Sequence, residues 1–232
     1  MHDMDTIQQQ YKRSDFELMA PVGSYESLHA AIDAGADAVY LGLGTLNMRA
    51  RSSVNFTTED LRVITDTCRQ AHVKVYLTLN TVLYDEDMDA AAEILHKAKE
   101  CGVSAVIASD IAAIQMARDL GLEVHISTQC NVTNFRALRF YAQWADTVVL
   151  ARELNLDQVY AIYRQIEQED LRGPHGEQVK IEMFCHGALC MAVSGKCYMS
   201  LHQMDSSANR GSCTQICRRA YDLTDRDTGQ QI

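Results

Sequence analysis

Seven short apolar runs alternate with amphipathic stretches along this chain of 232 residues, and this alternation constrains the fold more than any other feature. Apolar runs between single helices are typical of parallel strands that are covered on both faces. The expected strands are residues 16–21, 38–43, 73–79, 103–109, 122–128, 147–151 and 180–184. The expected helices are residues 24–35, 85–99, 111–120, 134–144 and 156–168, with a further helix that begins at Thr57 or Thr58.

Consecutive β/α units of about 20–35 residues fit a (β/α)₈ TIM-type barrel better than a doubly wound sheet. No eighth unit follows the seventh strand, although residues 221–224 resemble a strand, so we expect an incomplete barrel cut from a longer protein. The predicted organisation is a polar N-terminal extension (1–15), seven barrel units (16–187) and a cysteine-rich segment (188–232).

Composition indicates an ordinary globular protein, with 47% hydrophobic and 22% charged residues. No apolar run approaches the roughly 18–20 residues that span a bilayer, and the polar, acidic start lacks the features of a signal peptide. We therefore expect a cytoplasmic protein that does not contact membranes, in a compartment where disulfides are rare. The net charge of −10 argues against nucleic-acid binding over the whole surface, but leaves room for a local basic patch.

Half of the eight cysteines lie in the last fifth of the chain, at Cys190, Cys197, Cys213 and Cys217. Clustered thiols in a reducing compartment point to metal or redox chemistry. The last two could form a zinc knuckle, but six residues separate the first two, which is too wide for a second knuckle and favours a bulkier iron–sulfur cluster. Of the remaining four, we expect Cys68, Cys101 and Cys185 to be packing residues, whereas Cys130 fits either packing or function.

Polar residues follow several expected strands, where a barrel would have its active face. Capping of the next helix is an equally good explanation for Ser109, Asp110 and Asn131. It does not account for Arg152 and Glu153, because a helix cap does not need an arginine. The residues expected at this face are Asn80, Thr81, Ser109, Asp110, Thr128, Gln129, Cys130, Asn131, Arg152, Glu153, His186 and Gly187.

One long motif makes a specific resemblance. It reads Glu182-x-Phe184-x-x-Gly187-Ala-Leu-Cys190-x₄-Gly195-x-Cys197-x-Met199-Ser200, and Asn209-Arg-Gly-x-Cys213-x₃-Cys217-Arg continues it. The pattern resembles the signature of the collagenase-like peptidase family U32. Shorter matches at residues 19–23, 36–42 and 152–154 extend the similarity over nearly the whole chain.

The resemblance implies a barrel-like fold and a [4Fe–4S] cluster held by Cys190, Cys197 and Cys213. Cys217 is one candidate for the fourth ligand, and a residue beyond position 232 is the other. Better-understood members of the family are oxygen-independent hydroxylation enzymes that act on tRNA uridine, an rRNA cytidine or ubiquinone precursors. For the RNA-acting members, prephenate is linked to the reaction.

The charges around the cysteines help to weigh these substrates. Residues 183–220 carry four cationic side chains and one acid, a local charge of +3 in an acidic chain. A basic rim suits RNA or prephenate better than a quinone tail, although it would also offset the negative charge of a thiolate-bound cluster. We expect the anion-binding residues to be Lys196, Arg210, Arg218 and Arg219, and the catalytic residues to be Arg152, Glu153, Glu182 and His186.

The leading hypothesis is thus an iron–sulfur hydroxylase of RNA, with tRNA uridine as its substrate. A collagenase-like protease is the alternative, but the sequence has neither Gly-x-Ser-x-Gly nor His-Glu-x-x-His. Cys185 and His186 would also point to opposite faces of a strand. A third reading is a non-catalytic, cluster-binding subunit of a heterodimer, and a homodimer is equally open. The modified nucleoside, the oxygen donor and the partner are not fixed by the sequence.

Overall fold

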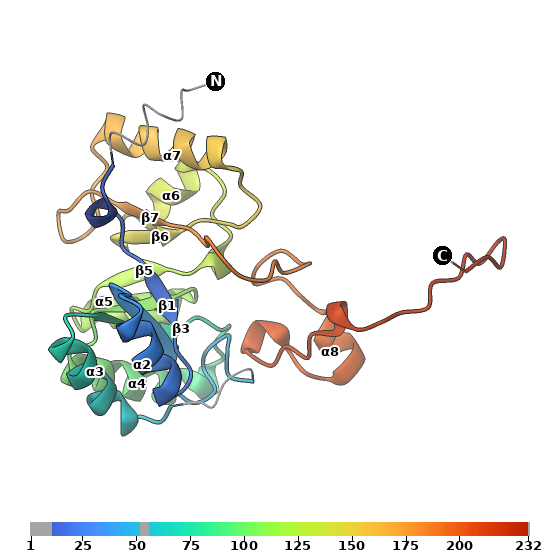
Figure 1. Ribbon diagram of the computed structural model, residues 1–232, viewed down its shortest axis with the longest axis horizontal. Helices are drawn as coiled ribbons and strands as arrows, with labels where there is room; N and C mark the ends of the chain where they lie inside the picture. Colours follow the sequence, from blue (N-terminus) through green and yellow to red (C-terminus); the bar gives the residue numbers. More distant parts are fainter. Residues whose placement is uncertain (1–10, 52–55, 232) are drawn as a thin grey trace.

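A computed structural model describes residues 11–51 and 56–231. Its centre is a sheet of seven parallel strands that follow one another in chain order, as in a TIM-type barrel (Figure 1). The described residues contain no pairing between the first and last strands, so the barrel is incomplete, as predicted. The strands are β1 (Met19–Pro21), β2 (Ala38–Gly42), β3 (Lys74–Leu79), β4 (Ala105–Ala108), β5 (Val124–Ile126), β6 (Thr147–Val149) and β7 (Lys180–Glu182).

One helix follows each of the first six strands and packs on the outside of the sheet (Figure 1). Each of these helices was predicted from the sequence, and local signals explain their ends. The Ser24 hydroxyl, for example, accepts the Ser27 amide at 3.2 Å and so begins the first of them. The helices are α2 (Tyr25–Asp33), α3 (Asp60–Gln70), α4 (Met88–Cys101), α5 (Ile111–Asp119), α6 (Phe135–Tyr141) and α7 (Leu156–Glu169), and short 3₁₀ turns are η1 (Arg13–Asp15), η2 (Asp85–Asp87) and η3 (Thr128–Cys130).

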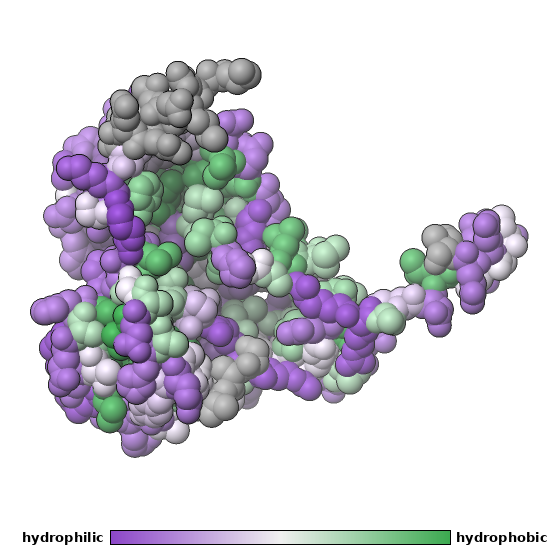
Figure 2. Space-filling view, viewed as in Figure 1, coloured by the Kyte–Doolittle hydropathy of each residue, from purple (hydrophilic) through white to green (hydrophobic). Residues whose placement is uncertain are grey.

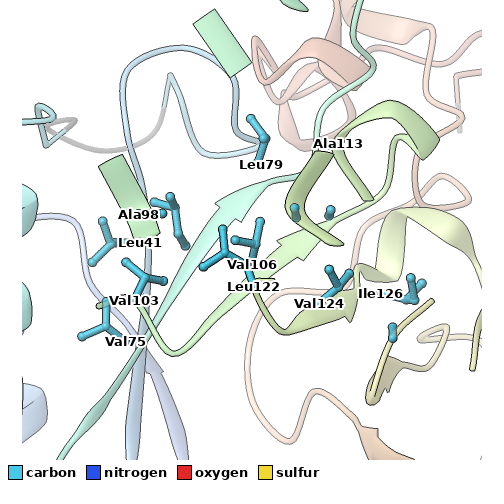
Figure 3. Close-up of a cluster of buried hydrophobic side chains, with 14 of the residues drawn as sticks. Leu41, Val75, Leu79, Ala98, Val103, Val106, Ala113, Leu122, Val124 and Ile126 are labelled. Atoms are coloured by element: carbon cyan, nitrogen blue, oxygen red, sulfur yellow. The ribbon is translucent and has the colours of Figure 1, made fainter. Parts of the chain in front are cut away.

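The main core lies between the sheet and these helices. Leu41, Val75 and Val106 project from neighbouring strands toward helical residues such as Ala98 and Ala113 (Figure 3). Cys68 and Cys101 are buried in this layer, which confirms that they are packing residues. This apolar layer fixes the positions of the strand ends and therefore of the loops that follow them.

The opposite, concave face of the sheet carries a smaller and more polar set of side chains. Tyr40 and Tyr76 are register partners on β2 and β3, and Tyr76 is 4% exposed. His125 on β5 is equally buried and packs against the Tyr76 ring, with 4.6 Å between ring centroids. These residues occupy alternate positions along strands whose other side chains enter the main core.

The chain leaves the sheet after Glu182 and crosses the carboxyl ends of the strands as an irregular segment (Figure 1). Because β7 ends at Glu182, the cysteine-rich segment predicted for residues 188–232 begins earlier, and from here on the name refers to residues 183–231. It contains one short helix, α8 (Met199–Met204), and the 3₁₀ turns η4 (Ala208–Arg210) and η5 (Ile216–Arg218). None of the described helices is both long and apolar enough to cross a membrane.

Three sequence expectations at this end of the chain are wrong. The seventh strand ends at Glu182 rather than at residue 184, and Cys185 is exposed instead of packed. The reason is that, among residues 11–51 and 56–231, β7 pairs only with β6, which leaves the residues after it exposed. Residues 221–224 form no strand either, because Thr224 makes only an isolated bridge to Gln231. Residues 1–10 of the expected N-terminal extension lie outside the described residues.

Candidate functional site

A cavity of about 230 Å³ opens where β3, β4 and β5 end. The loops after these strands supply its floor, and the cysteine-rich segment supplies Gly195 and Asn209 on the other side. This is the face on which a TIM-type barrel places its chemistry. The lining residues are Met48, Asn80, Thr81, Val82, Ser109, Asp110, Gln129, Cys130, Tyr141, Gly195 and Asn209.

Hydrogen bonds among the loops that follow β3, β4 and β5 hold this floor in place. The Asn80 side-chain amide donates to the Ser127 hydroxyl at 3.1 Å, and the Ser109 hydroxyl donates to the Asn80 carbonyl at 2.9 Å. Asp110 accepts the Ala112 amide at 2.9 Å and so caps α5. The capping interpretation is therefore correct for Asp110, whereas α6 is capped by Asn134 and not by Asn131.

A second cavity of about 300 Å³ lies beside the first, and Thr81 lines both. Its other walls come from the loop after β2 and from residues between α8 and η4. Most of its polar groups are hydroxyls, and its charged side chains are one aspartate and one arginine. The lining residues are Thr45, Leu46, Thr81, Asp205, Ser206, Ser207, Arg210 and Ser212.

Two glycines allow the cysteine-rich segment to approach the barrel this closely. A Cβ atom on Gly195 would lie 2.6 Å from the Gln129 carbonyl oxygen, and one on Gly211 would lie 2.2 Å from the Asn47 carbonyl oxygen. Both glycines also have positive φ angles, which other residues rarely adopt. Asn209 completes the contact by accepting the Val82 amide through its carbonyl, at 3.1 Å.

Arg210 fastens the segment to the loop after β3. Its guanidinium donates to the Asp87 carboxylate at 2.6 Å and lies 4.1 Å from the centre of the Tyr84 ring. The same hydrogen bond holds the pKa of Asp87 below its usual range. Arg210 was predicted to bind an anionic substrate, but in the structure its charge is matched by a carboxylate of the barrel.

The other predicted anion-binding residues are exposed. Arg218 donates to the Leu189 carbonyl at 2.7 Å, which links η5 to the start of the cysteine-rich segment. Lys196 and Arg219 project from the same segment. Three of the four basic side chains thus remain open to solvent on one segment, and only Arg210 is tied to the barrel by an ion pair.

The four predicted catalytic residues are not joined to one another by any hydrogen bond or ion pair within residues 11–51 and 56–231. Arg152 donates to the hydroxyl of Ser194, a residue that is 3% exposed, and thereby anchors the cysteine-rich segment at the end of β6. Glu153 and His186 are exposed. Glu182 is the last residue of β7, is partly buried, and lies near His125 of the concave face.

Burial raises the pKa of Glu182 to about 7. The positive charge of nearby His125 opposes this effect, and the Glu17 carboxylate adds to it. A carboxyl group in this state can hold or release a proton near neutral pH, which is what a general acid or base requires. Glu182 was predicted from the sequence, whereas its buried neighbours His125 and Tyr76 were not, because their only signal is alternation along apolar strands.

Cys130 forms part of the first cavity wall. Its thiol donates to the Ser109 carbonyl at 3.5 Å, and burial raises its pKa. The Tyr141 hydroxyl lies beside it, and burial raises the pKa of that group to about 12. Both side chains therefore stay protonated at neutral pH and present a neutral wall.

The four thiols expected to bind a cluster share one segment but do not converge. Cys190 and Cys213 are exposed, Cys197 and Cys217 are partly buried, and none is in a disulfide. In the part of the chain that the structure describes, no three His, Cys, Asp or Glu side chains lie close enough to hold a metal ion. The donor chemistry suits an iron–sulfur cluster, but the positions of the thiols in this structure do not fit one.

Comparison with known proteins gives the family context of this site. The chain is 60% identical to a collagenase of Porphyromonas gingivalis over 94% of its length and 53% of that protein. It is 36% identical to the 23S rRNA 5-hydroxycytidine C2501 synthase of Escherichia coli, covering 93% of the chain and 31% of that protein. It is 34% identical to the tRNA hydroxylation protein P1 of Bacillus subtilis, covering 93% and 49%. The chain thus spans about half the length of most of these relatives, or less.

The fold agrees with a solved structure. The U32 peptidase Mk0906 matches with a TM-score of 0.55 over 75% of this chain and 70% of that one, at 15% identity, which supports the incomplete barrel. The model of the family described as "Peptidase family U32" matches residues 23–231, which include strands β2 to β7 and all four clustered cysteines but not β1. On this evidence the chain belongs to peptidase family U32.

Proposed function

We propose that this chain is the barrel and cysteine-rich part of an oxygen-independent RNA hydroxylation protein that acts on tRNA uridine. The observation that carries the proposal is the docking of the cysteine-rich segment over a polar cavity at the carboxyl ends of β3–β5. A 23S rRNA 5-hydroxycytidine synthase and a tRNA hydroxylation protein each align with 93% of the chain, and these similarities support the proposal.

The residues of the site have distinct roles in this proposal. Glu182, with its pKa of about 7, holds or releases a proton during the reaction. Arg152 is a positioning residue, because it acts on the cysteine-rich segment through Ser194. The exposed Lys196, Arg218 and Arg219 bind RNA phosphates, while Glu153 and His186 stand at the rim where substrate would enter.

We further propose that Cys190, Cys197, Cys213 and Cys217 hold a [4Fe–4S] cluster, which would supply redox or substrate-activating chemistry. Their free thiols support this, as does their position in a segment with little packing of its own. Binding would have to draw the thiols together. Iron and sulfide analysis after anaerobic purification tests the proposal, and a colourless protein with stoichiometric zinc and no sulfide would end it.

The function itself is tested by mass spectrometry of tRNA and rRNA nucleosides. A strain that lacks the gene for this chain should lose a hydroxylated pyrimidine from its tRNA, and the intact gene should restore it. We also expect the modification to depend on prephenate, so a strain unable to make this acid should lose the same hydroxylated nucleoside. Unchanged nucleosides in both RNA classes would contradict the proposal.

A collagenase-like protease is the second candidate, because the relative that is 60% identical is named a collagenase. Proteolysis usually needs a nucleophile beside a base, or a metal. Within the described residues the histidines that pair do so with acids, His125 with Glu123 and His175 with Asp146, and not with a serine, threonine or cysteine. Gelatin cleavage that survives replacement of Cys213 and Cys217 would favour this candidate over hydroxylation.

A further inference from the structure

Thr81 is a buried polar residue with an unmet hydrogen-bonding capacity. Its side chain follows β3, is 1% exposed and lines both cavities at the strand ends. Its hydroxyl has no hydrogen-bond partner among the described residues. The side-chain oxygen of Gln129, which lines the first cavity, is likewise buried and without a partner there.

Unpartnered buried polar groups are uncommon because each costs about 1–3 kcal/mol. Two of them in the wall of one cavity indicate a ligand that supplies the missing hydrogen bonds. Asn80 and Ser109 line the same cavity but do not share this feature, because both already form hydrogen bonds within the floor of the site. Among the described residues, the Asn131 side-chain oxygen and the Arg152 Nε atom are also buried without a partner near these strand ends, but neither residue lines the two cavities.

Charge restricts the chemistry of this ligand. The Asp110 carboxylate in the first cavity already accepts the Ala112 and Leu83 amides. The Arg210 guanidinium in the second cavity is paired with Asp87. Neither cavity thus offers an uncommitted cation, so a dicarboxylate or a phosphate group would lack a counter-charge. A neutral ligand with several hydrogen-bonding groups fits both cavities better.

The two cavities differ in size and in lining, so we expect a ligand with two different parts. The first cavity, of about 230 Å³, has Gln129 to accept an N–H group and the protonated Cys130 and Tyr141 as its wall. The second, of about 300 Å³, is lined by the hydroxyls of Thr45, Ser206, Ser207 and Ser212. A planar ring with an N–H group suits the first, and a polyhydroxylated ring suits the second.

We propose that the two cavities together bind one pyrimidine nucleoside of the RNA substrate, with the base at Gln129, the ribose among the serines and Thr81 at the junction. This assignment rests on the proposed RNA hydroxylation and locates its substrate. Thr81 and Gln129 are then specificity residues, because they recognise the neutral base and sugar and not the phosphates.

The test is calorimetric titration of the whole chain with uridine and cytidine, each compared with the dipeptide glycyl-proline. Thr81→Val keeps the shape of the side chain but removes the hydroxyl, and should weaken nucleoside binding about tenfold. Thr81→Ser should retain most of the affinity. Thr67→Val, on the outer helix α3, replaces a threonine that bonds to its own helix and serves as the matched control.

Thermal unfolding separates a binding role from a structural one. Because Thr81→Val removes an unsatisfied buried hydroxyl, its Tm should equal or exceed that of the unchanged chain while binding falls. A lowered Tm with a proportional loss of affinity would overturn the assignment, and so would equal binding by the Thr81→Val variant. Tighter binding of glycyl-proline than of either nucleoside would overturn it as well.

These outcomes are distinct from failure of the proposed function. If the Thr81→Val gene restores RNA hydroxylation fully in the deletion strain, the function stands and the nucleoside site is wrong. If nucleosides bind in a Thr81-dependent way but no RNA nucleoside changes on deletion, the site stands and the proposed reaction is wrong.

Discussion

The barrel wall, by which we mean strands β1–β7 and helices α2–α7, is held together by different forces from the cysteine-rich segment. The wall buries large side chains such as Leu41, Leu77 and Leu95 completely between the sheet and its helices. In the segment, the only buried hydrophobic residues among those described are Ala208 and Ile216. Apolar surface remains exposed where the chain leaves the barrel (Figure 2). The exposed large hydrophobic residues of the cysteine-rich segment are Met183, Phe184, Leu189, Met191, Val193, Tyr198, Met199, Leu201, Met204, Tyr221 and Leu223.

The difference shows which part can fold from its own packing. Burial of apolar area accounts for the wall. The segment depends on a few polar anchors and on two glycines that fit against barrel carbonyls. We therefore expect mutations in the wall to change global stability, and mutations in the anchors to change the docking of the segment.

The largest effect is expected from Leu77→Ala in β3, because this side chain is fully buried. Loss of its packing should lower the free energy of unfolding by about 2–5 kcal/mol, as measured by urea denaturation. The matched control is Leu201→Ala in α8, a leucine that is 41% exposed, which should change it by about 0.5 kcal/mol or less. Similar losses in both variants would break the proposed distinction between the two regions.

Gly211→Ala should undock the segment without unfolding the wall. The added methyl group would collide with the Asn47 carbonyl at a positive φ of 82°, so we expect a local cost of about 1–3 kcal/mol or more. Faster hydrogen exchange across residues 195–217 is the measurement.

The control is Gly176→Ala, whose φ is 81° but whose Cβ would meet nothing within 4 Å. This variant carries the cost of the backbone conformation alone. If it speeds exchange in residues 195–217 as much as Gly211→Ala does, close approach to the barrel is not what holds the segment.

Glu182 should make the wall less stable as pH rises. Its folded pKa of about 7 exceeds the usual 4.5, so the unfolded chain loses this proton first. Stability should therefore fall from about pH 4.5 to 7 and then level off, by roughly 1–2 kcal/mol because the side chain keeps some exposure. Glu182→Gln should remove this slope in urea titrations at pH 5 and 8, and an unchanged slope would assign it to another group.

Asp87 should give the segment the opposite, and smaller, pH response. The Arg210 hydrogen bond lowers the folded pKa of Asp87 below its usual 3.8, so its contribution is complete above that pH and is lost as pH falls through the folded value. We expect a loss of about 1 kcal/mol in docking, seen as faster exchange at residues 205–212 below pH 4. Asp87→Asn should show this fast exchange already at pH 7, and slow exchange in that variant would contradict the tether.

Sequence patterns predicted the wall well because its signals are local. Apolar runs, the Ser24 cap and helical spacing each lie within one element, and every predicted strand through the seventh is present. The helix α8 was not predicted, since six residues carry too little periodicity to recognise.

The site was predicted only in part, for a related reason. Their positions after expected strands predicted Asn80, Thr81 and Gln129 as residues of the site, and all three line the first cavity. The partner of Arg210 is 123 positions away along the chain, at Asp87, so nothing local could show that its charge was already matched. Tyr76 and His125 were missed because they sit in strands that are apolar on their other face.

The two unpaired edges of the sheet, β1 and β7, bear on how this chain behaves at high concentration. Free backbone N–H and C=O groups at an edge invite another molecule to add a strand. Here each edge is only three residues long, and β1 ends in Pro21, which has no amide hydrogen to donate. The exposed Lys180 puts a charge on the other edge. Both edges are thus short and poorly suited to pairing with a strand of another molecule.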